Sequence, residues 1–195
     1  MIRSFLAIEI PEELRKKIYE SFARLHRQLP DVKWVDPSHM HLTLRFLGNV
    51  EEKMLDEDLI PRLSRLATKF SAMNFALKGI GLFPSIQKPK VFWLGLAGDL
   101  VPLKRLQHQL VNVLSDLPFQ AEQKEFQPHI SLGRIKALSD RSKWQKALEE
   151  YEKVELGTFQ VTHFALFKSQ LTSLGPLYTK LKEFHFSNEF PKSGN

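Results

Sequence analysis

The four-residue pattern of a histidine, an aliphatic residue, a hydroxyl residue and a leucine occurs twice in this 195-residue chain, each time within alternating apolar and polar side chains. The first copy is His41-Leu42-Thr43-Leu44 and the second is His129-Ile130-Ser131-Leu132. Alternation with a period of two predicts a β-strand whose histidine and hydroxyl face one side, with the aliphatic residues on the other. Similar strand and helix signals surround each copy. The repeat therefore predicts two related lobes.

The rest of the chain divides into strands and helices. Apolar residues at helical spacing predict helices over residues 11–29, 51–70, 100–114 and 142–151. Alternation and β-rich composition predict strands over residues 2–9, 32–35, 40–47, 74–80, 91–96, 128–135, 159–167 and 178–186. Pro61 predicts a kink or a break in the second of these helices. No Pro/Gly/Ser-rich linker separates the halves, so we expect residues 1–195 to form one domain, with 191–195 as a loose tail.

The composition excludes several classes of protein. Hydrophobic residues make up 43% and charged residues 26%, as in ordinary folded domains. The chain has no cysteine, which rules out disulfides, thiolate nucleophiles and zinc sites with cysteine ligands. No signal peptide or membrane-spanning run is recognisable, so we expect a cytoplasmic protein. The net charge of +6 favours a polyanionic partner, although many basic proteins bind no nucleic acid.

The two motifs supply what phosphodiester cleavage needs. Residues i and i+2 on a strand point the same way, about 6 to 7 Å apart, so the histidine and the hydroxyl of one motif reach one site together. An imidazole exchanges protons near neutral pH, and a hydroxyl donates a hydrogen bond to an oxyanion. In-line attack on phosphorus requires one group to remove a proton and a second group to supply one. A single motif is more often structural, but two copies in repeated surroundings favour catalysis.

Further segments resemble the 2H phosphoesterases, and most closely the RNA 2',3'-cyclic phosphodiesterases, formerly called 2'-5' RNA ligases. The resemblance spans almost the whole chain. The matching residues are Trp34-Val35, Pro37, His41 to Gly48, Gly81 to Pro84, Pro89 to Gly95, Pro128 to Arg134, Ser169 to Leu171 and Gly175 to Tyr178.

This resemblance implies a bilobal α+β fold, in which two pseudo-twofold-related lobes each have a small antiparallel sheet backed by helices, with the catalytic cleft between them. It also implies hydrolysis of RNA 2',3'-cyclic phosphate ends to 2'-phosphomonoesters and the capacity for reverse 2'-5' ligation. No metal, other cofactor or obligate protein partner is implied. We expect a monomer whose partner is an RNA end.

Carried over by position, the resemblance makes His41 the general acid and His129 the general base. Thr43 and Ser131 hold the non-bridging oxygens, and Ser131 replaces the family's commoner threonine without losing the donor. The acid and base roles rest on the resemblance, because a pseudo-symmetric site allows the two histidines to exchange them.

Three residues near the motifs are candidate substrate contacts. The resemblance implies that Arg134 binds phosphate or stacks on a base. It implies that Phe46 offers a face for base stacking, although alternation predicts that Phe46 lies on the apolar face of the strand with Leu42 and Leu44. Arg45 shares the predicted face of His41 and Thr43 and contacts phosphate, or else it marks a solvated strand end.

Other polar and aromatic residues are expected to be structural. Trp34, Trp93 and Tyr178 are predicted to pack in the core, and His39 to lie in a surface turn. Two other functions remain open: the same chemistry on another cyclic phosphate or on a 2'-5' linked nucleotide, and a non-catalytic RNA-binding module.

Overall fold

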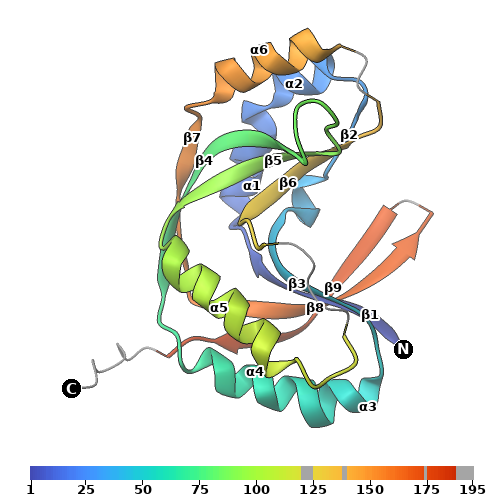
Figure 1. Ribbon diagram of the computed structural model, residues 1–195, viewed down its shortest axis with the longest axis vertical. Helices are drawn as coiled ribbons and strands as arrows, with labels where there is room; N and C mark the ends of the chain where they lie inside the picture. Colours follow the sequence, from blue (N-terminus) through green and yellow to red (C-terminus); the bar gives the residue numbers. More distant parts are fainter. Residues whose placement is uncertain (120–124, 138–139, 174, 188–195) are drawn as a thin grey trace.

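An antiparallel sheet of nine strands runs through the whole molecule (Figure 1). The computed structural model describes residues 1–119, 125–137, 140–173 and 175–187. The strands follow the order β7-β4-β5-β6-β3-β1-β8-β9, and β2 pairs with β6 beside this path. Their bounds are β1 Ile2–Glu9, β2 Val32–Trp34, β3 His41–Val50, β4 Met73–Phe83, β5 Val91–Gly98, β6 His129–Ile135, β7 Glu155–Val161, β8 His163–Thr172 and β9 Gly175–His185.

Apart from β2, the sheet consists of two four-stranded halves with matching order. One half is β6-β5-β4-β7 and the other is β3-β1-β8-β9, so the two motif strands β6 and β3 meet in the middle. In the described part of the chain, Leu42 and Ile130 are the only register partners that join them. The predicted α+β fold with two lobes is confirmed, and the two expected small sheets are joined into one.

Helices cover each half of the sheet. Helices α1 (Glu12–Ser21), α2 (Ala23–Gln28) and α6 (Arg141–Tyr151) lie with β4 to β7, while α3 (Glu52–Met54), α4 (Ile60–Ala67) and α5 (Leu100–Val113) lie with β3, β8 and β9 (Figure 1). Helices α1 and α5 each cross from the half that holds their preceding strand to the other half. This exchange gives both halves residues from distant parts of the sequence.

Several predicted elements are broken or divided. The helix predicted over 11–29 is split at Phe22 into α1 and α2. The helix predicted over 51–70 contains a π-helix, Leu55–Leu59, directly before α4. Pro61 has no N–H to donate to a preceding carbonyl, so the predicted interruption is confirmed. The strand predicted over 159–167 is two strands, β7 and β8, which belong to different halves. The predicted tail lies outside the described residues.

The core fills the space between the helices and one face of the sheet. Leu6, Leu42, Phe92 and Ile130 from the sheet belong to the same buried cluster as Leu106 of α5. We call this side the helix face, and we call the opposite side, which carries the two motifs, the motif face. Among the described residues, no helix is long and apolar enough to cross a membrane.

Candidate active site

The two motifs lie antiparallel, side by side, at the centre of the sheet. Because Leu42 pairs with Ile130, His41 comes opposite Ser131 and Thr43 comes opposite His129 on the other face of the two strands. Neighbouring strands bound this group, since β1 pairs with the His41 strand and β5 pairs with the His129 strand. The sheet thus gathers two imidazoles and two hydroxyls into one patch with a pseudo-twofold axis through the Leu42 and Ile130 pair.

A bulge at the last residue of each motif changes the direction of the side chains after it. The register of β3 against β1 shifts between Thr43 and Arg45, and the register of β6 against β5 shifts between Ser131 and Gly133. A bulge adds one unpaired residue, so the alternation resumes one position late. Leu44 and Leu132 are the extra residues, and both are buried.

The bulges overturn part of the alternation predicted from sequence. Arg45 was expected on the face of His41 and Thr43, but it pairs with Leu6 on the helix face and is only 3% exposed. Phe46 was expected on the apolar face, but it pairs with Phe5 on the motif face and is 67% exposed. Both strand-face predictions are wrong, because period two holds only while the strand remains regular.

The same correction applies to the second motif strand. Unbroken alternation would align Gly133 with His129 and Ser131, but Gly133 pairs with the fully buried Phe92 of the helix face. Arg134 pairs with Val91 and returns to the motif face. Phe46 and Arg134 therefore occupy equivalent positions, five residues after their histidines, and both project from the face that carries the motifs.

Both motif histidines are fixed through the same ring nitrogen. The Nδ1 of His41 lies 2.7 Å from the carbonyl oxygen of His39, and the Nδ1 of His129 lies 2.7 Å from that of Gln127. A carbonyl oxygen only accepts, so each Nδ1 carries the hydrogen and donates it. Each Nε2 is then left for proton exchange at the site.

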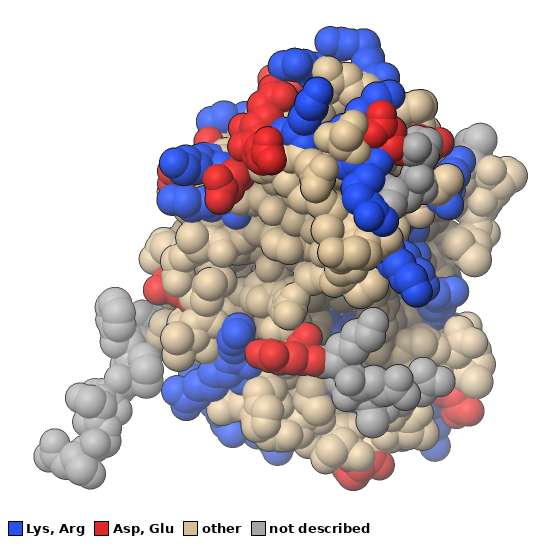
Figure 2. Space-filling model, turned by 45° about the horizontal axis from the view of Figure 1, so that its top comes forward, with Lys and Arg blue, Asp and Glu red and all other residues tan. Residues whose placement is uncertain are grey.

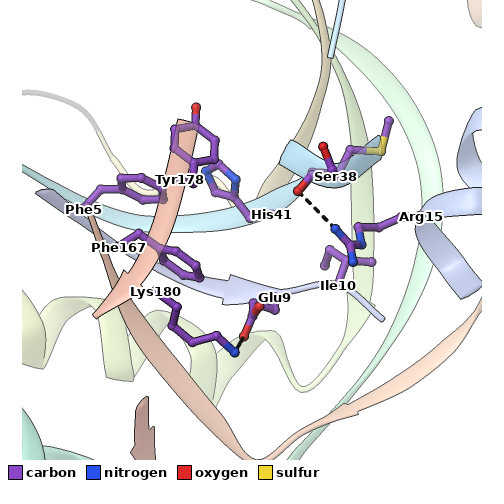
Figure 3. Close-up of a pocket in the computed structure, with 10 residues that line it drawn as sticks. Phe5, Glu9, Ile10, Arg15, Ser38, His41, Phe167, Tyr178 and Lys180 are labelled. Atoms are coloured by element: carbon purple, nitrogen blue, oxygen red, sulfur yellow. Dashed lines mark hydrogen bonds and ion pairs between the residues drawn. The ribbon is translucent and has the colours of Figure 1, made fainter. Parts of the chain in front are cut away.

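The segment before His41 is held in place from helix α1. Arg15 donates from its guanidinium to the carbonyl oxygen of Ser38 at 3.1 Å (Figure 3). It also donates to the carbonyl oxygen of Pro37 at 3.3 Å. The Asp36 carboxylate accepts from the backbone N–H of Ser38 at 2.8 Å and caps the short 3₁₀ helix Pro37–His39. This segment ends in the carbonyl that orients His41, so Arg15 fixes the histidine indirectly.

Aromatic rings surround His41 on the β1 and β9 side. Its ring centroid lies 4.9 Å from that of Phe5 and 5.4 Å from that of Tyr178 (Figure 3). Tyr178 also contacts His39. This burial is the main cause that lowers the pKa of His41 below its ordinary value. The hydrogen bond to the His39 carbonyl opposes the shift, and the neighbouring His39 imidazole lowers the pKa further. Tyr178, expected only to pack, packs against a motif histidine.

The second histidine has a comparable aromatic neighbour. Phe83 meets His129 edge-on at 4.9 Å and stacks on Trp93 at 5.1 Å. On the other half of the sheet, Phe5 stacks on Phe167 at 5.3 Å. Trp93 pairs with Ser131 and so belongs to the motif face, which contradicts its predicted place in the core. Trp34 does pack against Phe92 of the core, as predicted.

A pocket of about 260 Å³ adjoins His41 (Figure 3). Its walls include Phe5, Phe167 and Tyr178, and its polar end is the Lys180 ammonium, 2.6 Å from the Glu9 carboxylate. Lys180 also lies 2.6 Å from Glu183.

One group of residues near this pocket has metal-ligating side chains. Glu9, Glu183 and His163 bring ligand atoms within 4.8 Å of one another. The Lys180 ammonium is hydrogen-bonded to both carboxylates, which makes the group an ion-pair network rather than a cation site.

Sequence comparison identifies relatives over almost the whole chain. The LigT like Phosphoesterase family profile matches residues 8–93 and 99–178. A Thermotoga maritima protein named RNA 2',3'-cyclic phosphodiesterase is 37% identical, over 95% of this chain and 96% of its own length. A Methanocaldococcus jannaschii protein of the same name is 34% identical, over 94% of this chain and 100% of its own length.

Solved structures agree with the sequence matches. A Thermus thermophilus crystal structure superposes with a TM-score of 0.81 at 31% identity and covers 97% of this chain and 100% of its own. The structure of Escherichia coli LigT complexed with 3'-AMP gives a TM-score of 0.74 at 25% identity, over 95% of this chain and 98% of that one.

Proposed function

Because this chain belongs to the LigT-like phosphoesterase family, we propose that it is an RNA 2',3'-cyclic phosphodiesterase that converts cyclic phosphate ends to 2'-phosphomonoesters. The resemblance noted in the motifs is confirmed by the family match. Relatives of that name align over nearly the full chain. The structural observation that carries the proposal is the antiparallel contact of the two histidine motifs at Leu42 and Ile130.

Hydrolysis needs one proton moved on each side of phosphorus. In the proposed reaction, His129 Nε2 takes a proton from water as the water oxygen bonds to phosphorus. The bond from phosphorus to the ribose 3' oxygen breaks, and His41 Nε2 gives its proton to that oxygen. The products are a 2'-phosphomonoester and a free 3' hydroxyl. Each acid or base contributes roughly 10² to 10⁴ in rate.

The hydroxyls of Thr43 and Ser131 support this reaction from between the histidines. Each stands opposite the histidine of the other motif, so both are placed to donate to the non-bridging oxygens of the same phosphate. A cyclic phosphate bound there carries a negative charge, which raises the pKa of a nearby imidazole and offsets the effect of burial on His41. This supports the role of His41 as the acid in the loaded site.

Phe46 and Arg134 make the pseudo-symmetric site chemically asymmetric. At equivalent positions, the half that contains β3 presents the exposed ring of Phe46 and the half that contains β6 presents the guanidinium of Arg134. A ring suits base stacking, and a guanidinium suits phosphate oxygens. We assign base stacking to Phe46 and phosphate binding to Arg134. Arg45 is left out, because it lies on the helix face.

The proposed enzyme acts as a cytoplasmic monomer, without a metal or an organic cofactor. In 2'-5' ligation the 5' hydroxyl of a second RNA takes the place of water: His129 takes its proton, the bond from phosphorus to the 3' oxygen breaks, and His41 protonates that oxygen. The two histidines exchange these roles when a 2'-5' bond is cleaved back to a cyclic phosphate end.

Turnover of short RNAs ending in 2',3'-cyclic phosphate tests the proposal. In excess chelator, purified protein should release only the 2'-phosphate isomer, which chromatography separates from the 3' isomer. His41→Ala and His129→Ala should each lower kcat at least about a hundredfold. His108→Ala, at an exposed position on α5, is the matched control. Release of the 3' isomer, or full activity of either motif variant, would refute the assignment.

A further inference from the structure

Two cations stand side by side on the motif face, beyond the second motif. Lys33 of β2 and Arg134 of β6 are direct register partners, and both are exposed. Their face follows from their neighbours: Val91, the partner of Arg134 on β5, is two residues from Trp93, which pairs with Ser131. Trp34, next to Lys33, points the opposite way into the core, where it contacts Phe92.

This pair has no carboxylate partner within residues 1–119, 125–137, 140–173 and 175–187, where the ion pairs involve other cations. Like charges placed directly opposite on adjacent strands destabilise a sheet. Lys180 shows the contrast, since two carboxylates hold its ammonium. An arrangement that costs stability and has no internal compensation is typical of a surface that binds an external anion.

The position of the pair relates it to the reacting phosphate. Arg134 is three residues beyond Ser131, which corresponds to roughly 7 to 10 Å along a bulged strand and is comparable to one nucleotide unit. On the other half of the sheet, burial raises the pKa of Tyr178, and the positive charges of Arg134 and Arg3 oppose this shift. Figure 2 shows a recess between the two halves of the molecule, with Lys and Arg side chains on its right-hand rim.

We infer that Lys33 and Arg134 together bind the phosphodiester directly upstream of the terminal nucleotide, so that the enzyme prefers the end of an RNA strand to a free cyclic mononucleotide. The inference rests on the proposed function. It adds Lys33 to the site and assigns the pair a phosphate distinct from the one that reacts. Two donors of the same charge suit the two non-bridging oxygens of a phosphodiester.

Kinetics with three substrates distinguish the effect of the charge of the upstream linkage from the effect of its size. The first is a nucleoside 2',3'-cyclic phosphate, the second a dinucleotide with the same end, and the third that dinucleotide with a neutral methylphosphonate linkage. The ratio of kcat/KM for the second to that for the first measures the preference. We expect a ratio of about ten or more for the natural chain, and a ratio near one when the methylphosphonate replaces the phosphodiester.

Variants at Lys33 test whether this side chain is responsible for the preference for the dinucleotide. Lys33→Gln should lower the preference severalfold and make kcat/KM for the dinucleotide less sensitive to salt, whereas Lys33→Arg should retain it. Lys153→Gln removes the same charge from an exposed turn after α6 and is the control, expected to leave the preference unchanged.

The outcomes distinguish this inference from the proposed function. If neither the mononucleotide nor the dinucleotide is hydrolysed, the proposed function fails. If the dinucleotide is hydrolysed but is not preferred to the mononucleotide, or if Lys33→Gln lowers kcat/KM for all three substrates equally, the upstream phosphate site is wrong and the proposed function stands.

Discussion

Leu42 and Ile130 are direct partners across β3 and β6, and both side chains are fully buried. This contact joins the two halves of the sheet and sets the two motifs opposite each other. Its apolar side chains belong to the core, while the residues on either side of them carry the proposed chemistry. Packing on one face of the sheet therefore sets the geometry of the site on the other face.

Shortening either member of this pair should affect both stability and activity. Leu42→Ala leaves a cavity where the halves meet, so the free energy of unfolding should fall by about 2 to 5 kcal/mol. The activity of the folded fraction should fall as well, because the motifs lose their common support. Urea unfolding and kcat measured below the transition test this prediction. Leu177→Ala, half-exposed on β9, should change stability by no more than about 0.5 kcal/mol.

The pH dependence of kcat/KM should identify the acid. Burial and the neighbouring His39 lower the pKa of His41, so in the free enzyme its protonated form is lost as the pH rises through a value below 6.5. As the acid, His41 then sets the alkaline limb of the pH profile. His39→Asn removes a nearby charge and should move that limb to higher pH. A shift of the acidic limb instead would make His41 the base.

Arg15 should behave as a positioning residue. Arg15→Ala removes the hydrogen bonds to the carbonyls of Pro37 and Ser38 and frees the segment that orients His41. We expect kcat to fall about tenfold with little change in KM, since small displacements of a catalytic group are costly. The His41 ring resonances should also broaden or move in NMR spectra.

The control for Arg15 is Arg24→Ala, which breaks an exposed ion pair to Glu150 and should leave kcat unchanged. Equal losses in the two variants would assign the effect to general destabilisation of the helices.

The neighbours Arg45 and Phe46 should have opposite phenotypes. Phe46→Ala should raise KM for RNA ends roughly tenfold with unchanged thermal stability, because an exposed ring contributes to stacking and not to the core. Arg45→Ala should lower the melting temperature, because it removes a buried side chain from the helix face. Thermal unfolding and steady-state kinetics of both variants test whether Arg45 lies on the helix face and Phe46 on the motif face.

Local features of this protein could be predicted from the order of its residues. Alternation around His41 and His129 predicted two strands with a histidine and a hydroxyl on one side, and both strands are present. Pro61 predicted an interrupted helix. These features depend on residues close together in the chain, where strand period, helix period and the missing proline N–H act directly.

The side chains that surround the motifs depend on how distant strands pair in the folded chain. The bulges at Leu44 and Leu132 arise against the partner strands β1 and β5, and they place Arg45 in the core and Phe46 on the surface. Tyr178 reaches His41 from β9, and Lys33 reaches Arg134 from β2. Strand pairing between distant segments follows from burial across the whole sheet, so no local pattern in the sequence specifies these contacts.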